Sequence, residues 1–350
     1  MSARLFCRLK ISPTALTARS IHRLASTYPT AIKPTKDEIS NGRLASRNLE
    51  KAIRCLHEDG LVVIEDAIPH EDLDRLNAKM VQDARTLQSR GKDMPFNYNV
   101  GNSKLRRPRK EPTPNTTSTL THHLTVQQDP PPTSKYFPPS IFLNPLATQL
   151  TTTHLGPRPK WTFCSGNSAM PNPTPQRQPV HSDADFAHPT HPFALVINVP
   201  LIDFTPENGS TELWLGTHTG PLSGLQVQEG AHGDRASGRI KEPLLAERRE
   251  IRAPCQPSVR KGSIVVRDLR LWHAGMPNLT DEVRVMLALI HFAPWYRNPM
   301  RLELAEGLRG LVEEAGGGLE VPVDWVGEEE VMGRYLGRGF GNSYDFGQVE

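Results

Sequence analysis

The stretch Gln178-Pro-Val-His-Ser-Asp183 places a histidine and an aspartate two positions apart. In an extended segment such side chains point to the same side, so His181 and Asp183 can address one ion while Ser182 points away. A further histidine, His273, follows a later apolar segment. Two imidazoles and one carboxylate on one face of an octahedral ion leave three positions open, which suits ferrous iron that must bind a bidentate cosubstrate and oxygen together. We therefore expect a metal site at His181, Asp183 and His273.

Apolar, β-branched segments on both sides of this motif predict short strands. Residues 193–199 form a continuous apolar run, and Asn208-Gly209 is then typical of a hairpin turn before residues 213–216. Residues 263–267 predict another short strand, and the segment after it brings the chain to His273. The pattern is strand, turn, strand, and it is repeated in the second half of the chain.

Arg284 stands immediately before the apolar run 285–292. A charged side chain at the start of a buried strand is costly unless an anion meets it, and the planar guanidinium fork matches a carboxylate with two parallel hydrogen bonds. Arg284 could bind the far carboxylate of a 2-oxoacid cosubstrate, and a structural ion pair would satisfy it equally well. We expect His188 and His191, which follow the first motif, in a loop beside the site rather than on the metal.

Three segments together resemble the phytanoyl-CoA dioxygenase family of iron(II)/2-oxoglutarate oxygenases, and its fungal members in particular. They are Gln178-Pro-Val-His-Ser-Asp183, Glu207-Asn-Gly-Ser-Thr-Glu-Leu-Trp-Leu-Gly-Thr-His218 and Arg267-Asp-Leu-Arg-Leu-Trp-His-Ala-Gly-Met-Pro-Asn278. The resemblance covers about residues 45–350, with metal ligands, connecting turn and distal arginine in the family's order and spacing. It implies a mainly β fold with flanking helices, whose core is a double-stranded β-helix, a cupin-like jelly roll of two facing sheets.

Carried over position by position, the resemblance implies that His181, Asp183 and His273 bind Fe(II) and that Arg284 grips the distal carboxylate of 2-oxoglutarate. Thr211, after the predicted turn, is a candidate for a hydroxyl contact with the same cosubstrate. The implied activity is that of a dioxygenase that consumes O2 and 2-oxoglutarate, releases succinate and CO2, and hydroxylates an unactivated C–H bond of a small organic molecule. Desaturation or ring formation would need the same ligands.

Two other classes of protein share parts of this pattern. A non-catalytic jelly-roll binding protein would have the same fold, but it would have no need for a full ligand set together with the arginine. A metal-dependent hydrolase, for example a zinc enzyme, could use two histidines and one aspartate. Zinc would not account for Arg284, and no nearby glutamate is evident as a general base.

Length and composition indicate one catalytic domain with appendages. The chain has 350 residues, and β architectures commonly reach about 250 residues as one unit. No apolar run reaches the roughly 18 residues that suggest a membrane span. Without its first 36 residues, the chain has 34 basic and 38 acidic residues and is therefore mildly acidic. A general basic surface for binding nucleic acid is not expected. The expected partner is a small organic substrate, with no nucleic acid and no membrane span, and the oligomeric state stays open.

The N-terminal residues 1–40 differ from the rest of the chain. Before Asp37 there are seven basic residues and no acidic one, in a segment rich in Ser, Thr, Arg and Leu. This composition resembles a mitochondrial transit peptide, so we expect a targeting or disordered leader over 1–40 and a mitochondrial location, with the cytoplasm as the alternative. Residues 41–350 are the predicted dioxygenase domain.

Within this domain, two helices and one insertion are predicted. Residues 49–56 and 68–81 carry apolar residues at helical spacing, and these helices are expected to brace the sheet. Residues 103–125 combine a basic cluster with Pro- and Thr-rich sequence and look inserted relative to the family. A segment with few large apolar residues cannot bury much surface, so disorder is expected there.

Overall fold

The computed structural model describes residues 26–91, 125–172, 177–230, 238–315 and 317–337. Its largest element is a seven-stranded sheet, in which neighbouring strands run antiparallel except for the parallel edge pair β1 and β2. The three central strands are mainly apolar and almost entirely buried, which suits a sheet covered on both faces. In order across the sheet, the strands are β1 (Ala31–Ile32), β2 (Leu61–Ile64), β9 (Ile264–Asp268), β5 (Ala194–Pro200), β11 (Arg284–Phe292), β4 (Lys160–Ala169) and β3 (Thr125–Gln128).

A second layer of very short strands faces this sheet. It contains β6 (Glu212–Leu213), β7 (Gln228–Glu229), β8 (Arg239–Ile240) and β10 (His273–Ala274). β6 pairs with β10, β7 pairs with β8, and His181 joins the two pairs through bridges to His273 and Arg239. Along the chain, β5, β9 and β11 of the large sheet alternate with β6 and β10 of the small one. This alternation is a double-stranded β-helix, as predicted.

The predicted turn at Asn208-Gly209 forms, but it does not join two paired strands. Gly209 has φ +81°, and a Cβ on it would lie 2.5 Å from the backbone oxygen of Met276, so glycine is required there. β5 pairs with β9 and β11 in the large sheet, whereas β6 belongs to the small sheet. The expectation of a hairpin is therefore wrong, because the apolar runs on either side of a turn do not reveal which partner each strand takes.

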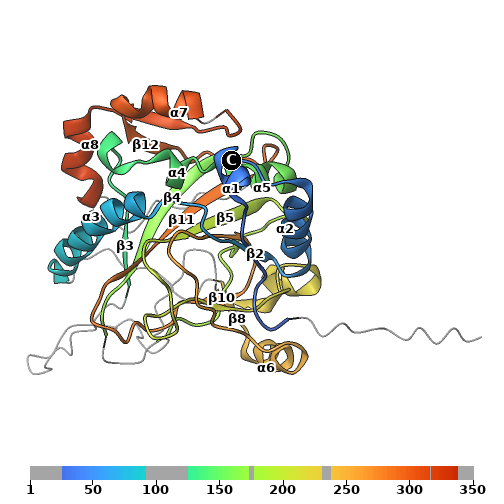
Figure 1. Ribbon diagram of the computed structural model, residues 1–350. Coiled ribbons are helices and arrows are strands. Elements are labelled where there is room, and N and C mark those ends of the chain that lie inside the picture. The colour runs from blue at the N-terminus through green and yellow to red at the C-terminus, as the bar shows by residue number, and fades with distance from the viewer. Residues whose placement is uncertain (1–25, 92–124, 173–176, 231–237, 316, 338–350) are drawn as a thin grey trace, which may run out of the picture.

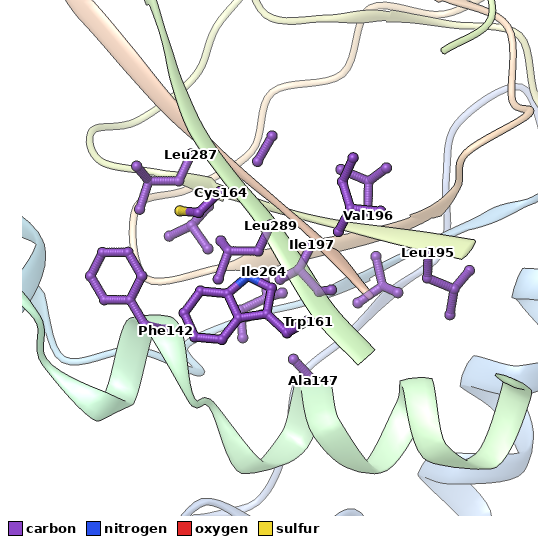
Figure 2. Packing of buried hydrophobic residues seen from close by; sticks show 14 of the residues in the cluster. Phe142, Ala147, Trp161, Cys164, Leu195, Val196, Ile197, Ile264, Leu287 and Leu289 are labelled. Carbon is purple, nitrogen blue, oxygen red and sulfur yellow. The ribbon is translucent and has the colours of Figure 1, made fainter. Parts of the chain in front are cut away.

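Helices cover the outer face of the large sheet (Figure 1). The two predicted helices are α2 (Ser46–Glu58), which contacts β2, and α3 (His70–Gln88), which contacts β3 and β11. α5 (Pro145–Leu155) begins where the side chain of Asn144 accepts hydrogen bonds from two backbone N–H groups, and it packs against α2 and β5. Figure 2 shows the rings of Phe142 and Trp161 between the helix that carries Ala147 and the strands of the sheet.

The remaining elements are shorter. They are α1 (Lys36–Ser40), η2 (Ser134–Tyr136), α4 (Pro139–Phe142), η3 (Gly220–Leu222), η4 (Leu225–Val227), α6 (Glu242–Ile251), β12 (Leu302–Ala305), η5 (Glu306–Leu308), α7 (Arg309–Ala315), β13 (Val323–Val326), α8 (Glu328–Arg334) and η6 (Tyr335–Gly337). Among the described residues, no helix has the length and apolar character needed to cross a lipid bilayer.

Part of the predicted leader belongs to the folded domain. Ile32 in β1 is buried in the core, and β1 pairs with β2. At α1, Thr35 and Glu38 form a reciprocal capping box, in which each side chain accepts a hydrogen bond from the other residue's backbone N–H. The ordered domain therefore begins before residue 41. Residues 1–25 of the leader, and residues 103–124 of the predicted insertion, lie outside the described residues, whereas Thr125 begins β3.

His291 in β11 is a buried histidine far from the first motif. Its side chain is held by a hydrogen bond of 3.1 Å between its Nδ1 and Oγ1 of Thr151 in α5, and within the described part of the chain its Nε2 has no hydrogen-bond partner. Burial lowers the pKa of His291 from 6.5 to about 3. The unfolded chain therefore takes up a proton, between these two pH values, that the folded protein does not.

We expect His291→Leu to weaken the dependence of stability on pH. Because the unfolded state binds the extra proton, the free energy of unfolding falls as the pH falls below 6.5, by about 1.4 kcal/mol per pH unit for this group. Urea unfolding at pH 7 and pH 5 measures that slope. Thr151→Val removes the hydrogen bond but keeps the histidine, so this variant should retain the wild-type dependence of stability on pH. An unchanged slope in His291→Leu would show that the folded protein protonates His291 readily.

Candidate metal centre

Two backbone hydrogen bonds hold His181 and His273 side by side. The N–H of His181 donates to the oxygen of His273 at 2.9 Å, and the N–H of His273 donates back at 3.0 Å. Asp183 lies close by, and one ligand atom from each of the three residues lies within 4.8 Å of the others. Ser182 points elsewhere and donates to the backbone oxygen of Arg270. The structure thus brings together the three residues that the sequence predicted as ligands.

Backbone carbonyls set the tautomers of both imidazoles. Nδ1 of His181 donates to the oxygen of Pro179, and Nδ1 of His273 donates to the oxygen of Leu271, each at 3.0 Å. Because a carbonyl only accepts, the proton of each neutral ring must sit on Nδ1, which leaves the lone pair of Nε2 free. Each Nε2 lies 3.7 Å from a carboxylate oxygen of Asp183. This arrangement suits a cation between the three side chains.

The electrostatics favour the ligand forms of all three groups. Burial lowers the pKa of His181, and it is the largest cause that lowers the pKa of His273 to about 3. Burial alone would raise the pKa of Asp183, but Arg267 and the two imidazoles lower it below its ordinary value. At neutral pH the centre therefore presents two neutral imidazoles and one carboxylate. Two nitrogens and one oxygen, with the Asp183 side chain 29% exposed, fit a ferrous ion that keeps further positions open.

A cavity lies between the two sheets and reaches His273. Phe204, Val265 and Met286 contribute apolar wall, whereas Asn198 and Thr211 contribute polar groups. Thr211, predicted as a cosubstrate contact, therefore lines the same space as a candidate metal ligand.

Arg284 begins β11 and is 4% exposed. Its guanidinium donates to the backbone oxygens of Asn208 and Gly209, at 3.3 and 2.8 Å, and lies 4.6 Å from the ring centre of Phe204. Met286, two residues later and therefore on the same face of the strand, lines the cavity. Among the described residues no carboxylate forms an ion pair with Arg284, and burial lowers its pKa to about 10. The structural ion pair left open by the sequence is thus absent from the described part of the chain.

A second buried arginine, Arg267, was missed in the sequence analysis. It is 6% exposed, lines the cavity and donates from Nη2 to Oδ2 of Asp183 at 2.5 Å. The sequence contains the pattern that would have predicted it, because Arg267 lies in an apolar strand. A charge in such a strand needs an anionic partner, as was argued for Arg284. His188 and His191 lie outside the metal cluster; their rings contact Phe193 and Trp295, respectively.

Comparison with known proteins yields one family and several solved structures. The family model described as phytanoyl-CoA dioxygenase (PhyH) matches residues 56–286. AviO1 from Streptomyces viridochromogenes is 20% identical, with 73% of this chain and 99% of that chain covered and a TM-score of 0.45. The epimerase SnoN, in complex with Fe3+, alpha-ketoglutarate and nogalamycin RO, is 16% identical, with 71% and 84% covered and a TM-score of 0.48. EctD from S. alaskensis, with 2-oxoglutarate and 5-hydroxyectoine, is 16% identical, with 75% and 83% covered and a TM-score of 0.45.

The family match spans more than half of the chain and includes His181, Asp183, His273 and Arg284. The match agrees with the metal-ligand geometry of the described structure. The chain therefore belongs to the phytanoyl-CoA dioxygenase family of iron- and 2-oxoglutarate-dependent oxygenases.

Proposed function

We propose that this oxygenase hydroxylates an unactivated C–H bond of a small organic molecule, with Fe(II) as cofactor, 2-oxoglutarate and O2 as cosubstrates, and succinate and CO2 as products. The observation that carries the proposal is the arrangement of two features around one cavity. Two imidazoles with free Nε2 atoms stand beside a carboxylate, and one of them, His273, lines the cavity. The buried Arg284 has no ionic partner among the described residues and lies against the ring of Phe204, which also lines the cavity.

Each residue has a distinct role in this proposal. His181, Asp183 and His273 hold the iron, and Arg284 binds the distal carboxylate of 2-oxoglutarate with Thr211 as a hydroxyl contact. Iron and 2-oxoglutarate, once bound, supply the oxidising chemistry. The chain's own part is to orient the two ligands, and the apolar wall formed by residues such as Val265 and Met286 limits the access of water.

The chemistry of the cavity wall disfavours a hydrolase. A metal-dependent hydrolase needs a group that takes a proton from the attacking water. Among the described residues that line the cavity there is no aspartate or glutamate, and the charged side chain there is Arg267. A cationic wall suits the binding of an anionic cosubstrate instead.

An anaerobic titration tests the reaction class. Fe(II) and 2-oxoglutarate added together should produce a visible metal-to-ligand charge-transfer band, because the keto acid chelates the iron. Zn(II) in place of Fe(II) is the control and should produce no band. Absence of the band with Fe(II), in protein that binds iron, would refute the proposal. Succinate release across a substrate library, with product masses increased by one oxygen atom, then tests hydroxylation itself.

Single alanine replacements test the metal ligands. We expect His181→Ala, Asp183→Ala and His273→Ala each to abolish iron-dependent succinate formation, because each removes one of the three donors. The melting temperature of the two histidine variants should stay close to that of the wild type, whereas Asp183→Ala should lower it, because the buried Arg267 loses its carboxylate partner. His191→Ala removes a histidine whose ring contacts Trp295, outside the cluster, and should bind iron normally. Full iron occupancy in all three ligand variants would disprove the assignment.

Arg284→Leu tests the cosubstrate contact. Hydrogen bonds to charged groups contribute roughly 1.5–3 kcal/mol, so the affinity for 2-oxoglutarate should fall by about ten- to a hundredfold. Iron affinity should persist, because Arg284 lies outside the metal cluster. Calorimetric titration of the iron-loaded variant measures both constants. An unchanged dissociation constant for 2-oxoglutarate would show that Arg284 only supports the turn at Asn208 and Gly209.

A further inference from the structure

Arg267 is tied to the metal centre by a chain of hydrogen bonds that crosses three adjacent strands. In β11 the backbone oxygen of Leu287 accepts from Nδ2 of Asn198 at 3.2 Å. In β5 the Oδ1 of Asn198 accepts from Nε of Arg267 at 3.0 Å. In β9, Arg267 then donates from Nη2 to Oδ2 of Asp183. The large sheet thereby fixes the guanidinium, and the guanidinium fixes one oxygen of a candidate metal ligand.

A second buried arginine in the same segment shows what a purely structural pair looks like. Arg270 donates from Nε to Oδ1 and from Nη2 to Oδ2 of Asp268. Both carboxylate oxygens of Asp268 therefore accept hydrogen bonds from the same guanidinium. Arg267 occupies only Oδ2 of Asp183. Oδ1 of Asp183 lies 3.7 Å from Nε2 of His181 and accepts no bond from Arg267. Because Arg267 bonds to only one oxygen of Asp183, the other oxygen can bind a cation.

The guanidinium of Arg267 is also not fully satisfied by the fold. Its Nη1 is buried and has no hydrogen-bond partner among the described residues. Buried donors without a partner are rare in folded proteins, and each calls for an explanation. Arg267 itself lines the cavity beside His273, which is the space that the proposed function assigns to an anion.

We propose that Arg267 is a positioning residue that keeps Asp183 a one-oxygen metal ligand and thereby couples the metal centre to an anionic cosubstrate. The inference rests on the proposed function. A carboxylate that is free to turn could bind iron through both oxygens and take up a position that the bidentate keto acid needs. Arg267 also offsets the charge of Asp183, so the buried centre attracts a bare cation less strongly, and a dianion more strongly, than the three ligands would alone.

Binding measurements on the full chain test this role without turnover. In Arg267→Met, Co(II) should bind as tightly as in the wild type or more tightly, because a repelling charge is gone. The affinity of the Co(II)-loaded variant for 2-oxoglutarate should fall by roughly ten- to a hundredfold. Its Co(II) visible spectrum should differ from that of the wild type before 2-oxoglutarate is added, because Asp183 is then free to bind through both oxygens. Arg267→Lys keeps the charge and should recover part of the 2-oxoglutarate affinity.

Two further variants make the test robust. Arg260→Met removes the same charge from the surface, where Arg260 pairs with Glu65 at 3.2 Å, and should change neither affinity nor spectrum. Asn198→Ala keeps Arg267 but removes the amide that anchors it, together with a polar group of the cavity wall. This variant should shift 2-oxoglutarate binding in the same direction by a smaller factor, which keeps the test valid if Arg267→Met does not fold.

The outcomes separate the two proposals. If the wild-type protein loaded with Co(II) does not bind 2-oxoglutarate, the proposed function fails before any variant is considered. If the wild type binds it, three results would each overturn the role of Arg267. These are an unchanged 2-oxoglutarate affinity in Arg267→Met, an unchanged Co(II) spectrum, or a loss of Co(II) affinity as large as the loss of 2-oxoglutarate affinity.

Discussion

The pair of backbone hydrogen bonds between His181 and His273 is the constraint on which the metal centre depends. Through this bridge, a segment without regular structure becomes part of the small sheet and joins the pair β6–β10 to the pair β7–β8. The bridge brings the two imidazoles within 4.3 Å, centre to centre. Because carbonyls of the same segments accept from both Nδ1 atoms, the backbone also decides which nitrogen faces the ion. Fold and ligand chemistry are thus set by the same few residues.

Buried positive charge is the second organising feature. Arg267 and Arg284 both stand on the large sheet, and both are more than nine-tenths buried. Arg267 has a carboxylate partner, whereas Arg284 has only backbone oxygens and an aromatic ring among the described residues. Burying a charge without a counter-ion is costly, so such a residue is a strong candidate for binding an anionic ligand. The two arginines make the interior of the barrel suitable for an anion beside a cation.

Much of this architecture was predictable from local sequence patterns. The two-residue spacing of His181 and Asp183, the apolar strand at 193–199 and the helix over 49–56 all follow from periodicity, and each element is present in the structure. Pairing between distant segments was not predictable. Residues 208–209 were predicted to form a hairpin turn, because the sequence of a turn carries no information on which strands pair. β1 was assigned to the leader, because a strand of two residues is too short to show an alternation of apolar and polar residues. Arg267 was overlooked because its partners, Asn198 and Asp183, come from other segments.

The most direct test of the account is an anaerobic crystal structure of the protein with Co(II) and 2-oxoglutarate. The account predicts that Co(II) is bound by Nε2 of His181, Nε2 of His273 and one oxygen of Asp183, with the other oxygen on Arg267. It further predicts that the keto acid chelates the metal and that its far carboxylate lies within hydrogen-bond distance of Arg284. A metal bound through Nδ1, or a cosubstrate whose far carboxylate lies away from Arg284, would contradict it.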